Sequence, residues 1–308
     1  FMEMNSLFTR MQGMICRLRS KGRLRTAETY IATVRSFRKF LSQRDPLANG
    51  GRANDIMLDH ISGEVMEEYE AWCDRAGLVP NSISFYMRIL RAVYNKAVED
   101  SIIDDARPFR HVYTGNERTR KRAISIAALK RIKALDISPE SPVGFARDMF
   151  LMSFYLRGMS FVDMSFLRKC DLREGYLTYR RRKTGQRLTI RWTKEMQHLL
   201  DRYPENPTQY LLPIIATAGV DDRHCYRNAC SKINRNLKRV GELARVKVSL
   251  SMYVARHSWA TVARHKGIPV SIISEGMGHS SELTTQIYLA SLDGELVDNA
   301  NQVIIRSI

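Results

Sequence analysis

The most constraining feature of this sequence is a run of three short helical segments between residues 251 and 288. Ser251 can cap the first segment, residues 252–266, and a glycine directly follows it. Pro269 opens the second segment, which stops at Gly276, and Ser281 caps the third. The run therefore predicts three helices joined by tight turns.

Three side chains in this run suit phosphodiester chemistry. Arg256 offers a planar fork that matches two phosphate oxygens and does not lose its charge. His279 follows 23 residues later at a glycine turn, from which its ring can project into a cleft. Tyr288 comes nine residues after that. A phenol with an ordinary pKa of about 10 needs a base or an electropositive pocket to attack phosphorus. The three groups could cradle, polarise and attack a phosphodiester.

The charge of the chain points to a polyanionic partner. The net charge is +17 and the isoelectric point is near 9.9, and neutralising phosphates releases counterions and supplies affinity. Residues 117–308 carry 32 Lys and Arg against 18 Asp and Glu, whereas residues 1–116 carry 17 against 14. Because the basic clusters lie beside the phosphate motif and not along one amphipathic helix, nucleic acid is favoured over an anionic membrane surface.

Other features narrow the class of protein. No apolar run approaches the roughly 18 residues of a membrane span, and the first residues lack the regions of a secretory signal. Five scattered cysteines disfavour a disulfide framework and favour a reducing cytoplasm. His224, Cys225 and Cys230 have no second ligand pair at zinc spacing, so we expect no metal site.

The first predicted domain, residues 1–107, has a helical pattern. Thr26 can cap a segment in which Phe37 and Leu41 recur at helical spacing, and Ser62 and Asn81 can begin two more. The pattern predicts a compact bundle of about four short helices. We expect its partner surface to be DNA, contacted by four arginines before the first of these helices and along the third: Arg23, Arg25, Arg88 and Arg91.

Residues 108–123 have the composition of a linker, with Pro108, Gly115 and a basic cluster. The cluster is basic enough to follow a phosphate backbone, although a solvated charge run is the alternative. Its predicted DNA contacts are Arg118, Arg120, Lys121 and Arg122.

The second predicted domain, residues 124–308, begins with a helix near Ser125. A long apolar stretch over residues 147–167 is interrupted at Arg157-Gly158. Residues 176–185 indicate a strand entering a turn, and residues 188–192 the returning strand. A further helix is predicted over about residues 223–241.

The Arg256, His279 and Tyr288 spacing, with a Lys-Thr-Gly turn at Lys183, resembles the active-site signature of the tyrosine recombinases (phage-integrase family). The resemblance spans roughly residues 20–295. It implies a mainly α fold with a small antiparallel sheet, in which a helical, SAM-like core-binding domain and an α/β catalytic domain clamp DNA. It also implies that Tyr288 is the nucleophile and that Lys183 protonates the departing 5′ oxygen. We expect Arg181, just before this turn, to contact DNA.

Two positions depart from the family pattern. The Gly-x-Arg-x-x-Glu/Asp run of the family corresponds to residues 158–163, so Ser160 stands where the first catalytic arginine is expected. Arg157 is three residues earlier and about 60° around the axis if the helix continues. We expect it to replace that arginine, because a branch associated with mobile and invertible elements of gut anaerobes resembles this arrangement. Asp163 is expected to buttress an arginine.

Tyr253 is the second departure, where the family usually has histidine or lysine. A phenol can donate a hydrogen bond to a nonbridging oxygen, but it cannot serve as a general base near neutral pH. We therefore expect Tyr253 to hold the phosphate, and His279 remains the candidate base for the nucleophile.

The resemblance implies a site-specific DNA recombinase, an integrase or invertase, that acts through a 3′-phosphotyrosyl intermediate without any cofactor. The implied partners are double-stranded DNA and three further copies in a homotetramer on synapsed DNA, and accessory DNA-bending proteins are allowed. The implied location is the bacterial cytoplasm, at the nucleoid. The tail after Tyr288 is apolar enough to dock on a neighbouring protomer or back on the protomer that carries it.

Two alternatives stay open. A catalytically impaired, sequence-specific DNA-binding protein would follow if Ser160 marks a dead site. A type IB topoisomerase-like or resolvase-like enzyme would use the same covalent chemistry, although the compact helical first domain argues against it. The DNA target and the choice among integration, excision and inversion are not determined by the sequence.

Overall fold

The computed structural model describes residues 5–44, 55–117, 122–279, 281–289 and 305. The chain divides into two compact units, Phe1–Thr119 and Arg120–Ile308. Each unit has its own hydrophobic core. Within the described ranges, no helix combines the length and the apolar character needed to cross a membrane.

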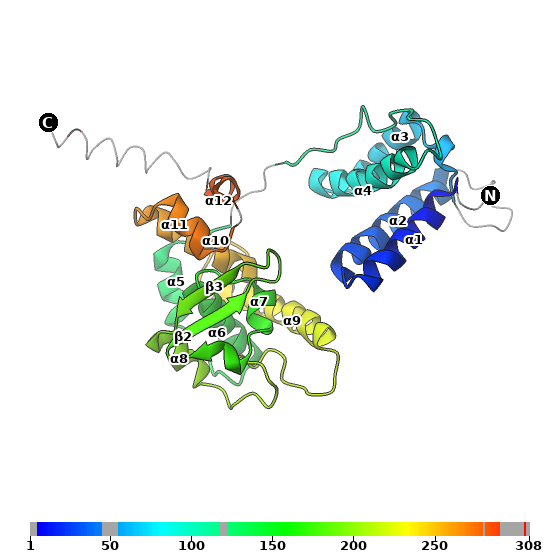
Figure 1. The fold of residues 1–308 in the computed structure, drawn as a ribbon. Helices are drawn as coiled ribbons and strands as arrows, with labels where there is room; N and C mark the ends of the chain where they lie inside the picture. The colour runs from blue at the N-terminus through cyan, green and yellow to red at the C-terminus, as the bar shows by residue number, and fades with distance from the viewer. Residues whose placement is uncertain (1–4, 45–54, 118–121, 280, 290–304, 306–308) are drawn as a thin grey trace. The chain divides into compact units, whose positions relative to one another are not determined.

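The described part of the first unit is helical, as predicted (Figure 1). Its elements are α1 (Leu7–Ser20), α2 (Leu24–Arg44), the 3-10 helix η2 (Leu58–His60), α3 (Gly63–Arg75) and α4 (Pro80–Glu99). Helices α1 and α2 lie side by side. The core is aromatic where α2 meets α3: the rings of Phe37 and Tyr69 meet edge to face with centroids 4.7 Å apart.

Helix α1 was missed by the sequence analysis, which began the helical pattern at Thr26. The signal was present, because Ser6 caps α1 by accepting a hydrogen bond from the Thr9 amide at 3.2 Å. Leu7, Met11 and Ile15 then recur at helical spacing and are buried.

Residues 108–117, which the sequence assigned to the linker, pack on the first unit. Phe109 and Val112 belong to its hydrophobic core. The Ser84 hydroxyl donates to the Gly115 carbonyl at 2.5 Å, and the Asn81 amide donates to the Glu117 carbonyl at 2.9 Å. The boundary between the units therefore falls after this segment, at Thr119 and Arg120.

The second unit combines helices with one small sheet. Its helices are α5 (Ile126–Lys133), α6 (Pro142–Tyr155), α7 (Phe161–Ser165), the 3-10 helix η3 (Lys169–Asp171), α8 (Lys194–Leu200), α9 (Asp222–Leu243), α10 (Met252–His265), α11 (Val270–Gly276) and α12 (Glu282–Leu289). Helix α6 packs against α5, α8, α9 and α10 and is buried almost throughout. Arg147 and Asp148 of α6 are both buried and form an ion pair, in which Arg147 Nε lies 2.8 Å from Asp148 Oδ1.

The sheet contains β1 (Leu172–Arg173), β2 (Tyr176–Arg180) and β3 (Arg187–Arg191), in the order β1-β2-β3 with antiparallel neighbours. The predicted hairpin is β2 and β3, in a register that pairs Leu177 with Ile190. Both of these side chains are buried against the helical core. The mainly α fold with a small antiparallel sheet is thus confirmed, and β1 and α8 are additions that the sequence analysis did not predict.

Candidate active site

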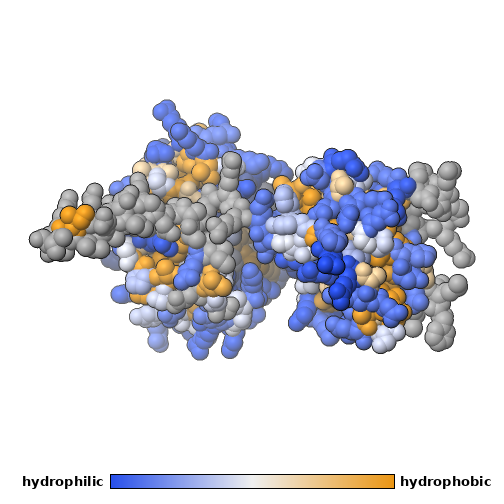
Figure 2. Space-filling model, turned by 90° about the horizontal axis from the view of Figure 1, so that it is seen from above, coloured by the Kyte–Doolittle hydropathy of each residue, from blue (hydrophilic) through white to orange (hydrophobic). Residues whose placement is uncertain are grey.

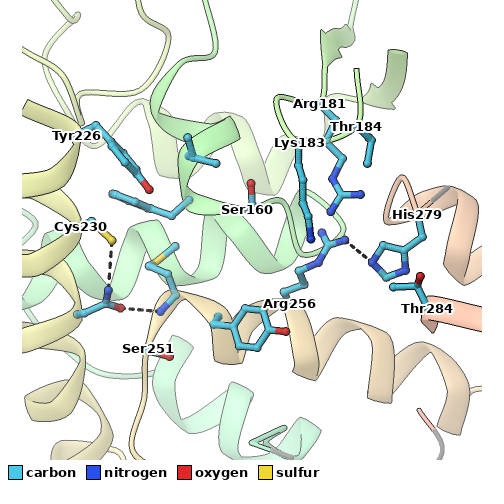
Figure 3. Close-up of a pocket in the computed structure, with 15 residues that line it drawn as sticks. Ser160, Arg181, Lys183, Thr184, Tyr226, Cys230, Ser251, Arg256, His279 and Thr284 are labelled. Carbon is cyan, nitrogen blue, oxygen red and sulfur yellow. Dashed lines mark hydrogen bonds between the residues drawn. The ribbon is translucent and has the colours of Figure 1, made fainter. Parts of the chain in front are cut away.

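A pocket of about 510 Å³ opens in the second unit between α7, the β2–β3 hairpin, α9, α10 and α12. Figure 3 shows a charged end, where Arg181, Lys183, Arg256 and His279 meet. The opposite end, around Tyr226 and Cys230 of α9, is uncharged. The pocket gathers elements that are up to 124 residues apart in sequence, from Ser160 to Thr284.

Arg256 is oriented by backbone carbonyls and by a histidine. It lies on α10 with 6% of its surface exposed. Its Nη1 donates to the Gly158 carbonyl at 2.7 Å, and its Nη2 donates to the Met277 carbonyl at 2.8 Å. The same Nη2 lies 2.9 Å from His279 Nε2. Carbonyl oxygens orient a guanidinium without neutralising its charge, so the pocket stays electropositive.

Gly158 makes this geometry possible. Helix α6 ends at Tyr155, and Arg157 and Gly158 both adopt a positive φ, of 59° and 68°. A Cβ on Gly158 would lie 2.8 Å from Arg256 Cα. Only glycine allows the chain to turn here and to bring its carbonyl to the guanidinium.

Arg181 is a second buried guanidinium in the same pocket. It is 7% exposed, and its Nη1 donates to the Gly278 carbonyl. Gly278 has a φ of 64°, and a Cβ there would lie 3.1 Å from Arg181 Cδ. In Figure 3, Arg181 reaches from the hairpin toward Arg256 and His279. The sequence analysis proposed Arg181 only as one DNA contact among several.

Arg157 does not continue the helix that the sequence predicted for it. The helical phasing that linked it to Ser160 is wrong, because α6 ends before Arg157 and the chain reverses through two left-handed residues. Arg157 is not among the residues that line the pocket. Its side chain lies beside α11, where a Cβ on Gly276 would be 3.7 Å from Arg157 Cδ.

Ser160 and Asp163 secure the hairpin. Ser160 caps α7, and its hydroxyl donates to Asp163 Oδ2 at 2.6 Å. The other carboxylate oxygen of Asp163 accepts the Arg182 backbone N–H at 2.9 Å. Asp163 therefore holds the backbone between Arg181 and Lys183, and this contact differs from the expected one with an arginine side chain.

His279 is a neutral ring at ordinary pH. Burial, followed by the positive charges of Arg256, Arg181 and Lys183, lowers its pKa to about 4. Its Nδ1 lies 2.7 Å from the Thr285 hydroxyl, which is fully buried on α12.

Of the remaining predicted catalytic residues, Lys183 and Tyr253 line the pocket. Lys183 is exposed in the hairpin turn and lines the pocket, and its side chain points toward Arg256 in Figure 3. Tyr253 lines the pocket from α10 with 58% exposure, and its ring meets the His257 ring edge to face with centroids 4.4 Å apart. Tyr288 lies on α12, one residue before its end, and its side chain is outside the described part of the structure.

The predicted DNA contacts of the first unit and linker lie at the surface where they are described. Arg23 and Arg25 are exposed around the start of α2, and Arg122 is exposed. Arg88 and Arg91 are half-buried on α4, and Arg91 Nη1 donates to the Thr114 hydroxyl at 3.2 Å. Three further predicted contacts, and the tail after α12 except for residue 305, lie outside the described residues: Arg118, Arg120 and Lys121.

The chain matches the models of two known protein families. The model of the phage integrase family matches residues 131–295, and that of the phage integrase SAM-like domain matches residues 6–112. The chain belongs to the tyrosine recombinases. It is a site-specific recombinase by family, and the pocket lies inside the matched catalytic region.

Relatives and solved structures agree with this assignment. The recombinase is 24% identical to a tyrosine recombinase of Pseudothermotoga lettingae over 289 residues, which cover 91% of this chain and 92% of the relative. A lambda integrase(75-356) dimer bound to a COC′ core site has the same fold, with a TM-score of 0.69, 15% identity and coverage of 92% and 95%. A lambda integrase tetramer bound to a Holliday junction gives a TM-score of 0.65 at 15% identity, with coverage of 92% and 77%.

The sequence analysis of this recombinase overlooked two features of its pocket. Thr285 was given no role from the sequence, although it contacts His279. The burial of Arg181 had a signal in strand alternation, since Leu177, Tyr179 and Arg181 share one face of the hairpin. Among the described residues, no group of three His, Cys, Asp or Glu side chains could hold a metal ion.

Proposed function

We propose that this recombinase cleaves and rejoins double-stranded DNA through a 3′-phosphotyrosyl link to Tyr288. One observation supports the proposal most: two buried guanidiniums, Arg181 and Arg256, meet His279 and Lys183 at one end of a pocket. That set fits a phosphodiester, because charge builds on the nonbridging oxygens as the tyrosine attacks. The helix that carries Tyr288 also supplies Thr284 to the same pocket.

Each group has a distinct task in this mechanism. Arg181 and Arg256 donate to the nonbridging oxygens and stabilise the five-coordinate transition state. Tyr253 adds a third donor from α10. Lys183, on an exposed turn, gives its proton to the departing 5′ oxygen and takes it back in the rejoining step. Arg181 takes the place of the arginine missing at Ser160, and Arg157 lies outside the chemistry.

His279 acts as a hydrogen-bond partner of the phosphate and not as the base for Tyr288. Burial and, after it, the surrounding positive charges lower its pKa, which weakens its hold on a proton. Its Nε2 also faces Arg256 at 2.9 Å. The same positive charges favour the phenolate of a nearby tyrosine, so Tyr288 loses its proton to solvent water as it attacks, and it takes a proton back from water when it leaves in the rejoining step.

The outcome we propose is strand exchange between two duplexes. The 5′ hydroxyl of a partner strand attacks the phosphotyrosyl bond, a new phosphodiester forms, and the tyrosine leaves. Because one phosphate ester replaces another, no nucleotide cofactor is consumed. Exchange between two duplexes requires four active sites, and a lambda integrase tetramer on a Holliday junction has the fold of this chain. Integration or inversion of a mobile element is the biological role that we infer.

Covalent capture tests the proposal directly. The full chain is incubated with duplexes whose central segment is randomised and nicked, so that cleavage releases a short strand and traps the protein. We expect adducts that survive denaturant with the wild type and none with Tyr288→Phe, which removes only the attacking oxygen. Absence of adduct from the wild type would leave a DNA-binding protein, and retained adduct in Tyr288→Phe would move the nucleophile.

The captured sequence then defines a duplex for a joining assay. Transfer of a labelled strand from one duplex to a second one supports recombination. Resealing of the original strand alone would support a topoisomerase-like enzyme instead.

A further inference from the structure

The contacts of His279 determine where its ring proton lies before DNA binds. Arginine nitrogens only donate hydrogen bonds, so the 2.9 Å contact from Arg256 Nη2 makes His279 Nε2 an acceptor. A neutral imidazole carries one proton, which must then be on Nδ1. Nδ1 donates that proton to the Thr285 hydroxyl at 2.7 Å.

This tautomer suits Arg256 but does not suit a phosphate. A phosphate oxygen only accepts, so His279 can contact it through Nε2 only if Nε2 carries a proton. Burial and the positive charges of Arg256, Arg181 and Lys183 lower the pKa of the ring to about 4 in the DNA-free pocket, so the ring is neutral when the phosphate arrives. A route that leaves the ring neutral moves its proton from Nδ1 to Nε2, away from the Thr285 hydroxyl and toward the phosphate.

Thr285 is the residue that makes either tautomer acceptable. Its hydroxyl has one donor and two acceptor positions and can rotate. It accepts from Nδ1 in the DNA-free protein and can donate to Nδ1 when that nitrogen has lost its proton. Because the hydroxyl can accept or donate, neither tautomer leaves Nδ1 without a partner at this fully buried threonine.

We propose that Thr285 is a positioning residue whose hydroxyl lets His279 exchange its ring proton from Nδ1 to Nε2 when the scissile phosphate enters the pocket. The exchange balances: one proton leaves Nδ1 to water, one arrives at Nε2 from water, and the charge of the ring does not change. His279 thus serves Arg256 in the waiting state and the phosphate in the reacting state. The proposal rests on the proposed DNA cleavage at this site.

The same contact ties the nucleophile's helix to the pocket. Thr285 and Tyr288 are three residues apart on α12, which is about one turn of helix. The Thr285–His279 hydrogen bond therefore fixes the helical turn that carries the proposed nucleophile next to the histidine.

Three variants of the full chain separate the hydroxyl from the shape of the side chain. Thr285→Val keeps the shape and removes both hydrogen-bonding roles, and we expect the adduct to form about 10- to 100-fold more slowly. Thr285→Ser keeps the hydroxyl and should restore most of the rate. Thr33→Val is the matched control: Thr33 is equally buried, in the first unit, and donates to the Thr29 carbonyl at 3.0 Å. It should lower the melting temperature without slowing adduct formation.

A spectroscopic measurement distinguishes the tautomer exchange from a purely structural role. In protein labelled with ¹⁵N-histidine, we expect His279 to show the Nδ1–H tautomer without DNA. In the Tyr288→Phe variant bound to the captured duplex, we expect the neutral Nε2–H tautomer, and Thr285→Val should weaken this exchange. An unchanged tautomer, a doubly protonated ring on DNA, or wild-type rates in Thr285→Val would each overturn the proposal.

The two proposals fail in different ways. If the wild type forms no adduct with any duplex, DNA cleavage itself is refuted, whatever the tautomer of His279. If the wild type forms adducts and Thr285→Val forms them equally fast, cleavage stands and the role of Thr285 is refuted.

Discussion

The arginine side chains of the pocket and those of the helical unit differ in burial and in the contacts that orient them. Arg181 and Arg256 are 7% and 6% exposed, and backbone carbonyls accept hydrogen bonds from both. Arg25, at the start of α2, is 84% exposed in its side chain and meets Glu28 at 3.4 Å. Figure 2 shows the hydrophilic side chains that cover much of the described surface in that view. The pocket charges are oriented before DNA arrives, whereas exposed cations of the helical unit such as Arg25 are solvated.

This difference predicts that the two sets of charges affect different quantities, the rate of cleavage and the affinity for DNA. Donors that are already oriented need no reorganisation as charge develops, so they act mainly on the rate of cleavage. Solvated cations release counterions from the duplex, so they act mainly on affinity and its dependence on salt.

The largest difference is expected between two arginines of the second unit. Arg181→Gln should slow single-turnover cleavage of the captured duplex by about 100-fold or more, because a donor aimed at the transition state is lost. Arg157→Gln should slow it by less than about tenfold, because Arg157 is not among the residues that line the pocket. Both variants should bind the duplex almost as tightly as the wild type. If Arg157→Gln slowed cleavage more than Arg181→Gln, Arg157 and not Arg181 would replace the arginine that is missing at Ser160.

A second prediction concerns the turn that orients Arg256. Gly175→Ala is the control. It should lower the free energy of unfolding by about 1–2 kcal/mol, since a φ of 77° is strained for alanine but the site has space for the added Cβ. Gly158→Ala carries similar strain plus a Cβ contact of 2.8 Å to Arg256 Cα, so we expect more than about 1 kcal/mol beyond the control. Unfolding by denaturant measures both. If the two substitutions lowered the free energy of unfolding equally, α10 would move easily to make room for the added Cβ, and Gly158 would not fix the Arg256 guanidinium.

A third prediction uses the electropositive pocket. The pKa of His279 is lowered to about 4, below the ordinary value near 6.5. A depressed pKa means that the unfolded chain binds this proton more readily, so stability from this group is lost as pH falls from about 6.5 toward 4. An NMR titration, assigned with His279→Gln, should find the ring neutral at pH 6 without DNA. An ordinary midpoint would contradict the burial of the ring beside the positive charges of the pocket.

The smallest effect on rate is expected from the helical unit. Replacing Arg23 and Arg25 by Gln should reduce the slope of log affinity against log salt by at most about 1.8, since each phosphate contact contributes about 0.9. Arg75→Gln on α3 is the exposed control outside the predicted surface. At saturating DNA, both should cleave at the wild-type rate. A rate defect at saturation would erase the proposed distinction between the two sets of charges.

These regions also differ in how far the sequence could predict them. Arg256 and His279 were predictable because their spacing within one run of capped helices places them near each other. The β2–β3 hairpin was predictable from its alternation and Lys-Thr-Gly turn. The packing of Phe109 and Val112 on the first unit was not, because it depends on tertiary contacts that a segment with linker composition does not reveal.

The choice between Arg157 and Arg181 shows why local geometry can mislead. The helical argument for Arg157 assumed a continuous helix, and two consecutive left-handed residues redirect the chain there. Arg181 is the second of four consecutive basic residues, from Arg180 to Lys183. Composition does not distinguish among them, whereas the fold buries Arg181, directly after β2, and leaves its neighbours exposed.

A crystal structure with a transition-state mimic tests the central claim most directly. The captured duplex, interrupted at the cleaved bond, is crystallised with the wild-type protein and orthovanadate, which adopts a five-coordinate geometry like that of phosphorus under attack. We predict that Tyr288 Oη is an apical ligand of vanadium and that Arg181 and Arg256 both donate to its equatorial oxygens. Arg157 in the position of Arg181, or another tyrosine at the apex, would contradict the proposed active site.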